Sequence, residues 1–408
     1  MPTAHPVLAL KRKCRLLLTA VLLVATTAWG QEPDEAALDS LRQRDDFVTA
    51  SLLVSTPGEK AYSAYGHCVV RMECPTFDLD YCFSFELYTD DTPGDYLRFF
   101  SGRTKAGFQA HKTSEYLQQC RHDGRGVTQW TLSLNPRQKQ ELWRGLDENI
   151  MEGMTQQFDY SYHNCTSMSF WAVGSQLQGE RLVVKAWPEV MRQSVRDMYT
   201  DYSRTAQWMQ LGLLTIMGTE VDDLKPMELY MVPEVVGDVL RQTVIVAADG
   251  TERPALLGEP VQLLPATYVA RAAWLSPTVA FLLVLLLVLA VTLGQWRFGW
   301  QRTAHVCDGM LFGAQALAGV GLLYFVLVSC IFGLHWNWVL LLLNPLPLLL
   351  WLWGRRWRWA PRVWLAYAVV LLLFAVLLPY VTDQLLPAHR LLALALCVRC
   401  GSLSRKRA

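Results

Sequence analysis

The stretch LSPTVAFLLVLLLVLAVTL, residues 275–293, contains 19 residues and no charged side chain. A helix of about 20 apolar residues is long enough to cross the hydrocarbon core of a bilayer. The stretch therefore predicts a transmembrane helix, and it divides the chain into a soluble part before it and a membrane part after it. Across all 408 residues only 18% of the side chains are charged, below the roughly one quarter usual for soluble domains.

More apolar stretches follow toward the C-terminus. The stretch 339–353 is interrupted by Pro345 and Pro347, which predicts a kinked or partly re-entrant segment. The last stretch, 391–398, is short for a span. We therefore expect an all-α membrane domain over residues 266–408, with four or five transmembrane helices. The apolar stretches after 275–293 are 310–332, 339–353, 363–380 and 391–398.

The loops between these stretches carry a charge bias that predicts the topology. One set of alternate loops is rich in arginine, whereas the other set, around His335 and Asp383, contains only Arg390. Positive loops stay in the cytoplasm, so we expect the soluble part on the opposite side of the membrane. The basic tail 405–407 favours five crossings over four. The arginines of the expected cytoplasmic loops are Arg297, Arg302, Arg355, Arg356, Arg358 and Arg362.

Residues 1–30 have the pattern of a secretory signal peptide. A basic segment precedes an apolar run at 16–28, and small residues lie just before Gln31, where we expect cleavage. The run of 13 residues is too short to span a bilayer comfortably, although an uncleaved anchor helix is the alternative. Residues 31–265 would then form an exported periplasmic domain.

The exported part predicts an α+β domain without internal repeats. One helix should begin at Asn164 or Cys165, where a polar stretch gives way to small and apolar residues at helical spacing. The net charge of the chain is +1 and this part has no basic run, so we expect no nucleic-acid partner. The predicted strands are 47–54, 68–72 and 81–87, and the predicted helices are 94–100, 136–150, 165–177 and 234–241.

The exported part contains five cysteines. Cysteines outside the cytoplasm tend to pair, and an odd number leaves at least one over. Cys165 is the best candidate for a reactive thiol because a helix N-terminus favours the thiolate form, which is the nucleophile. The alternative for any lone cysteine is a buried small hydrophobe. The other four exported cysteines are Cys68, Cys74, Cys82 and Cys120.

A nucleophilic thiol needs a base, and His67 has the most suitable setting. It follows Gly66, which permits close backbone approach, and it opens a predicted strand. A histidine on a strand facing a cysteine at a helix N-terminus is the papain arrangement, and a third polar group usually orients the base. The next strand offers Ser84 for that role. Three further histidines are set aside, His111 and His122 as solvated loop residues and His163 as pointing away from the thiol.

Several motifs, in the same order along the chain, resemble the Lnb-type lipoprotein N-acyltransferases. They occur in both the exported part and the membrane part, so the resemblance covers most of the mature chain. The matching segments are LVSTPG at 53–58, YGH at 65–67, TP at 92–93, YLRF at 96–99 with Gly102, NCT at 164–166, LHWN at 334–337 and NPL at 344–346.

The resemblance implies a circularly permuted papain-like or NlpC-like fold, in which the histidine precedes the cysteine. Lecithin:retinol acyltransferase is similar in that order and also moves acyl chains through a thioester. His67 and Cys165 match the catalytic pair of the family, whereas Ser84 stands where relatives usually have asparagine, which leaves the third catalytic residue open. The residues expected to support the site or its substrates are Tyr65, Gly66, Asn164, His335 and Asn344.

The implied reaction moves a fatty acyl chain from a membrane phospholipid to the α-amine of a diacylglyceryl-cysteine, through a thioester on Cys165. The expected partners are the phospholipid donor, diacylated lipoproteins and membrane lipid, and the resemblance implies a bacterial inner membrane with the catalytic domain in the periplasm. No cofactor or metal is expected, since His67, Asp78 and Asp80 do not have a convincing ligand spacing. Two alternatives are a membrane-tethered cysteine peptidase or amidase acting on cell-wall peptide, and a non-enzymatic envelope scaffold.

Overall fold

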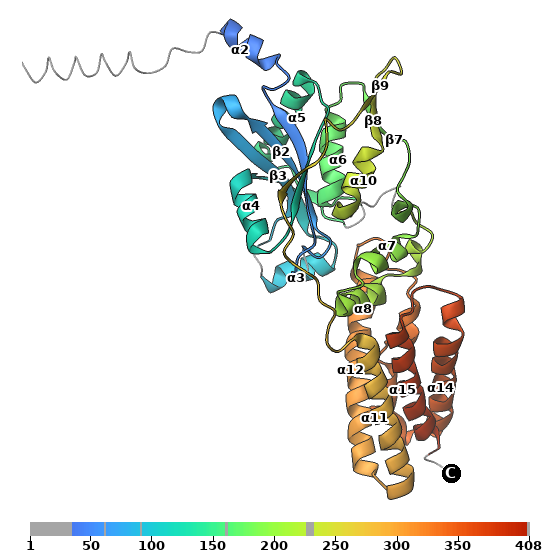
Figure 1. The fold of residues 1–408 in the computed structure, drawn as a ribbon. Helices are drawn as coiled ribbons and strands as arrows, with labels where there is room; N and C mark the ends of the chain where they lie inside the picture. Colours follow the sequence, from blue (N-terminus) through green and yellow to red (C-terminus); the bar gives the residue numbers. More distant parts are fainter. Residues whose placement is uncertain (1–34, 61–62, 90–91, 160–161, 226–231, 406–408) are drawn as a thin grey trace, which may run out of the picture.

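A computed structural model describes residues 35–60, 63–89, 92–159, 162–225 and 232–405. The predicted signal peptide and its cleavage point lie outside these residues. The described part consists of an α/β sheet domain followed by a bundle of long helices, with two short helices between them (Figure 1). The helical bundle begins at the apolar stretch 275–293, as the sequence predicts.

A seven-stranded antiparallel sheet organises the first domain, with the strand order β10-β5-β1-β2-β3-β4-β6. Its central strands are apolar on both faces because helices cover both sides of the sheet. The strands are β1 (Thr49–Ser55), β2 (His67–Cys74), β3 (Leu79–Leu87), β4 (Lys105–Lys112), β5 (Val127–Thr131), β6 (Gln156–Gln157) and β10 (Val261–Leu264).

The two faces of the sheet pack against different helices (Figure 1). Alternate residues of β1 show this, since Leu52 belongs to the core that includes α5 and α6, whereas Leu53 packs with residues of α4. A preceding short helix, α2, lies at the start of the described chain. These helices are α2 (Glu35–Arg42), α3 (Pro93–Phe100), α4 (Thr113–His122), α5 (Pro136–Met151), α6 (Cys165–Ser175) and α10 (Val236–Arg241).

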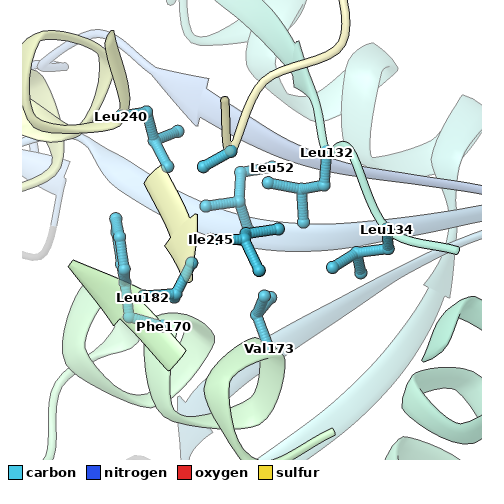
Figure 2. A pocket seen from close by; sticks show the side chains of 9 residues that line it. Leu52, Leu132, Leu134, Phe170, Val173, Leu182, Leu240 and Ile245 are labelled. Carbon is cyan, nitrogen blue, oxygen red and sulfur yellow. The ribbon is translucent and has the colours of Figure 1, made fainter. Parts of the chain in front are cut away.

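A second, three-stranded sheet packs on the outer side of α6. It consists of β7 (Arg181–Val184), β8 (Thr243–Val246) and β9 (Glu252–Pro254). Between it, α6 and the large sheet lies a small apolar cavity of about 10 Å³, lined by side chains such as Leu52, Phe170 and Ile245 (Figure 2). This volume is about that of a single water-sized probe, so the cavity is a packing gap in the core.

The helical bundle contains α11 (Pro277–Phe298), α12 (Gln301–Val328), α13 (Leu346–Trp353), α14 (Ala360–Val376) and α15 (Pro387–Ser404). By length and composition, three of the described helices could cross a membrane, namely Pro277–Phe298, Gln301–Val328 and Ala360–Tyr380. The expected kink is present, since the apolar stretch breaks into a short 3₁₀ turn, Trp338–Leu341, and α13.

The last helix is longer than the sequence indicates. The apolar stretch 391–398 is only the middle of α15, which has 18 residues. The Nε2 of His389, near its start, lies 2.8 Å from the hydroxyl of Thr215, at the end of the bundle that meets the first domain. Arg399, near its other end, pairs with Asp308 in the first turns of α12. α15 therefore runs along the bundle rather than forming a short terminal segment.

Two further helices connect the sheet domain to the bundle (Figure 1). They are α7 (Val195–Tyr202) and α8 (Gln207–Ile216). The buried guanidinium of Arg196 on α7 contacts Asp222 at 2.5 Å and the carbonyl of Gly218 at 2.6 Å. Gly218 in turn donates its N–H to the carbonyl of Gly333, in the loop that follows α12. These bonds fix the connecting segment that contains α7 and α8 to the membrane part.

Candidate active site

The start of α6 is fixed by the side chain of Asn164. This residue has extended backbone angles, and its Oδ1 accepts hydrogen bonds from the backbone N–H groups of Thr166 and Ser167, both at 2.9 Å. The hydroxyl of Ser167 accepts the N–H of Asn164 in return, which completes a capping box. Cys165 is consequently the first residue of α6, and it is partly buried.

His67 opens β2, directly after a backbone turn that requires glycine. Gly66 has φ +80°, and a Cβ at this position would lie 2.4 Å from the carbonyl oxygen of Ser55. Ser55 is also the residue that faces His67 across the β1–β2 pair. Gly66 therefore lets β2 begin close against β1, and it sets the position of the imidazole.

Ser84 supplies the third group of the site. It is fully buried on β3, and its hydroxyl lies 2.7 Å from Nε2 of His67. This contact occupies one ring nitrogen, and the same imidazole interacts with Cys165 through charge and a side-chain hydrogen bond. The structure thus brings together the three residues that the sequence suggested from two strands and a helix.

The charges at this site favour an ion pair between thiolate and imidazolium. Burial raises the pKa of Cys165, but the charge and hydrogen bond of His67 and the backbone N–H of Cys68 together bring it below its usual value. Burial likewise lowers the pKa of His67, but the charge and hydrogen bond of Cys165, with a contribution from Glu86, raise it on balance. Each partner stabilises the charged form of the other.

This coupling gives a prediction for thiol labelling against pH. Cys165 should react with a soluble alkylating reagent faster than the other exported cysteines, and the reaction should slow only as the pH falls through its lowered pKa. In His67→Ala, burial remains without the opposing charge, so the labelling curve should move to higher pH. Mass spectrometry of labelled peptides measures both. An unchanged curve in the variant, or a disulfide-linked Cys165, would contradict the pairing.

The other exported cysteines do not pair, contrary to the expectation for exported thiols. Cys68, Cys74, Cys82 and Cys120 are all free and buried in the described structure. Cys68 and Cys74 lie on the α6 side of the sheet, whereas Cys82 and Cys120 lie on the α4 side, so the sheet separates the two sets. Burial also raises the pKa of Cys82 to about 12. These four thiols are core residues.

Two histidines differ from the loop positions expected for them. His111 lies on β4, with its Nε2 3.2 Å from Glu86, and His122 is the exposed last residue of α4. His163 turns its ring to the carbonyl of Gln157 at 3.2 Å, away from the thiol as expected.

Arg125 is a neighbour of the site that the sequence did not indicate. It is buried, its charge acts on His67, and its Nη1 donates a hydrogen bond to the hydroxyl of Ser55 at 3.3 Å. Its charge opposes that of an imidazolium, whereas Glu86 favours it. A lone arginine in the turn before β5 carries no sequence signal for such a position.

Three residues expected to support the site are located elsewhere. The ring of Tyr65 packs edge-on against Tyr199 at 5.2 Å, and burial raises the pKa of its hydroxyl to about 12. His335 lies 3.5 Å from Glu220, in the loop after α12. Asn344 lies in the bundle, between the 3₁₀ turn and α13. Its amide donates to the carbonyls of Leu340 and Leu341 and to the hydroxyl of Tyr367. None of these contacts involves His67 or Cys165.

Within the described residues, no cluster of three or more His, Cys, Asp or Glu side chains could hold a metal ion.

Two family models match the chain. The Lnb N-terminal periplasmic domain matches residues 43–186, which include His67, Ser84 and Cys165, and the Lnb transmembrane domain matches residues 270–407. The chain belongs to the Lnb-type family. No curated protein and no solved structure matches it.

Membership of the Lnb-type family agrees with the architecture. The two matches and the three long apolar helices support a membrane protein with a periplasmic domain. The Lnb domains also suggest a membrane enzyme of lipoprotein biogenesis. The His67, Ser84 and Cys165 cluster lies inside the matched periplasmic domain, so it is the natural place to look for the chemistry of such an enzyme.

Proposed function

We propose that this Lnb-type protein is a lipoprotein N-acyltransferase with Cys165 as its nucleophile. The observation that carries the proposal is the contact of His67 with both Ser84 and Cys165, because a thiol, a base and an orienting group are what covalent acyl transfer requires. The fold supports it, since a histidine on a strand and a later cysteine at a helix N-terminus are the parts of a permuted papain-like domain.

In the first step, the thiolate of Cys165 attacks the carbonyl carbon of a phospholipid acyl ester. A C–S bond forms and the ester C–O bond breaks, leaving a thioester on Cys165. The imidazolium of His67 gives its proton to the departing lysophospholipid oxygen. His67 is already poised for this because the thiolate beside it raises its pKa.

In the second step, the α-amine of a diacylglyceryl-cysteine attacks the thioester carbonyl. The C–N bond forms and the C–S bond breaks, and His67 takes the proton that the amine loses. Cys165 leaves as a thiolate, which restores the ion pair. The Nε2 contact with Ser84 would hold the ring in one orientation through both steps.

The membrane part suits these substrates, because both are anchored in the same membrane. We further propose that the protein is a multi-pass inner-membrane protein, with α15 as a fifth crossing that returns the C-terminus to the cytoplasm. A cysteine peptidase or amidase acting on cell-wall peptide could use the same three residues. We favour acyl transfer because an enzyme for soluble or cell-wall substrates has little need for a multi-helix anchor.

Lipoprotein N-termini provide the test. In cells that rely on this chain for N-acylation, mass spectrometry of a model lipoprotein should find three acyl chains, and depletion should leave two chains and a free amine. Cell-wall peptides analysed from the same cells test the alternative. Unchanged lipoproteins with altered cell-wall peptides would replace acyl transfer by the peptidase or amidase function.

A further inference from the structure

The helix α3 has an outward face that is unusually apolar for a helix in water. Its N-terminus is capped by Thr92, which forms a capping box with the buried Asp95. The outward residues Tyr96, Leu97 and Phe100 are 55%, 62% and 42% exposed. Large apolar side chains grouped on one exposed face mark a contact surface.

The depth of α3 relative to the bilayer follows from α12. Asp308 is the last charged residue of that helix, and the uncharged part that follows, 309–328, has a length of about 30 Å, which matches the hydrocarbon thickness. From this length we place the last turn before Val328 at the outer edge of the hydrocarbon core.

α3 lies against this last turn. The rings of Phe100 and Phe325 meet edge-on at 5.7 Å, and the hydroxyl of Tyr324 donates to the carbonyl of Leu97 at 3.4 Å. Just beyond the turn, Cys330 donates its N–H to the carbonyl of Ser101 at 2.9 Å. Figure 1 shows α3 on the side of the sheet domain that faces the bundle. A helix at this depth meets lipid with its outward face.

The adjoining sequence has the charges that this position requires. Arg98, which pairs with Asp95 on α3, is exposed, as are Arg103 and Lys105 just after the helix. Basic side chains beside aromatic ones are typical of the membrane interface, where they meet the phosphate groups of lipids.

Aromatic contacts connect α3 to the chain that precedes α6 and Cys165. Phe99 stacks on Phe158 at 6.4 Å, and Tyr162, just before the cap of α6, meets Phe332 of the loop after α12 at 5.9 Å. Aromatic contacts thus join α3 to the chain before α6, and join that chain to the loop after α12, close in sequence to Asn164 and Cys165.

We propose that α3 is an interfacial helix whose residues Tyr96, Leu97 and Phe100 contact phospholipid of the periplasmic leaflet, on the side from which an acyl chain reaches Cys165. The entry of the acyl donor rests on the proposed function, whereas the lipid contact does not. The acyl ester would then approach the thiol from the membrane, without leaving the bilayer.

Photo-cross-linking in vesicles tests the contact. The full chain, with p-benzoylphenylalanine replacing Leu97, is reconstituted in phosphatidylethanolamine and phosphatidylglycerol vesicles and irradiated. We expect a cross-linked product in which position 97 carries the added mass of one phospholipid. Its yield should be at least about tenfold above that of a control with the same group at Leu257. Leu257 is also 60% exposed, but it follows β9, at the end of the domain away from the bundle (Figure 1).

The outcomes separate this inference from the acyltransferase proposal. The Leu97 adduct should form equally in a Cys165→Ala background, because the contact needs no chemistry. A lipid adduct without any acyl transfer by the wild-type protein would leave the helix assignment intact and overturn the proposed reaction. Equal yields at Leu97 and Leu257, or a cross-link to a second copy of the chain in place of lipid, would overturn the interfacial role.

Discussion

Replacing Cys165 with alanine is expected to eliminate acyl transfer to lipoproteins, because the covalent route has no other nucleophile at this site. His67→Ala should lower transfer by about two or more orders of magnitude, since the thiol is then mostly neutral at pH 7. Ser84→Ala should cost less than His67→Ala, because its 2.7 Å contact orients the ring without touching the thiol. The readout is the fraction of triacylated lipoprotein N-termini, measured by mass spectrometry.

A matched control for these variants is Ser51→Ala. Ser51 is also a buried serine of the large sheet, but its hydroxyl contacts Gln129 and Thr131. This variant should retain activity near that of the wild type, with all variants compared at equal abundance in the membrane. Equal losses for Ser84→Ala and Ser51→Ala would show that Ser84 acts through folding alone.

Replacing Arg399 with leucine should strongly destabilise the membrane bundle. Arg399 and Asp308 are almost completely buried, and they form two hydrogen bonds of 2.6 and 3.0 Å. Arg399 also donates to Thr292 and Gln295 of α11, so it joins three helices. Removing one partner of a buried pair leaves an uncompensated charge and costs about 3–5 kcal/mol. Thermal unfolding in detergent and abundance in membranes measure the loss.

The double variant Asp308→Leu/Arg399→Leu should recover much of the lost stability, because it removes both charges and leaves an apolar contact. Arg302→Leu serves as the control, since this arginine is exposed near the start of α12, the helix that contains Asp308. If Asp308→Leu and Arg399→Leu were each as stable as the wild type, the pair would not stabilise the bundle. A double variant less stable than either single variant would point instead to the remaining polar partners on α11.

The sequence indicated the elements that carry the site because their signals are local. Gly66, before His67, permits a close approach of two backbones, and Asn164, before Cys165, caps a helix. Both features can be predicted from the neighbouring residues alone. Long apolar runs likewise located α11 and α12. These are features that a single stretch of chain determines by itself.

Features that depend on distant residues were missed. β4 has polar residues at its outer end and was not expected as a strand, so His111 was placed in a loop. α15 seemed short because Arg399 interrupts its apolar run, and the partner that allows this residue to be buried, Asp308, belongs to another helix. The sheet also separates Cys68 and Cys74 from Cys82 and Cys120, and the number of cysteines in a sequence does not reveal which thiols can meet.

The central claim is that Cys165 carries the acyl chain during transfer, and trapping this intermediate tests it most directly. The purified full-length protein is incubated with a phospholipid of defined acyl chains, without a lipoprotein acceptor, and is then quenched in acid for peptide mass spectrometry. The account predicts one acyl chain on the peptide that contains Cys165, attached by a thioester that hydroxylamine cleaves and that disappears when acceptor is added. Acyl transfer at the normal rate with Cys165 unmodified throughout, or an acyl chain on another residue, would contradict it.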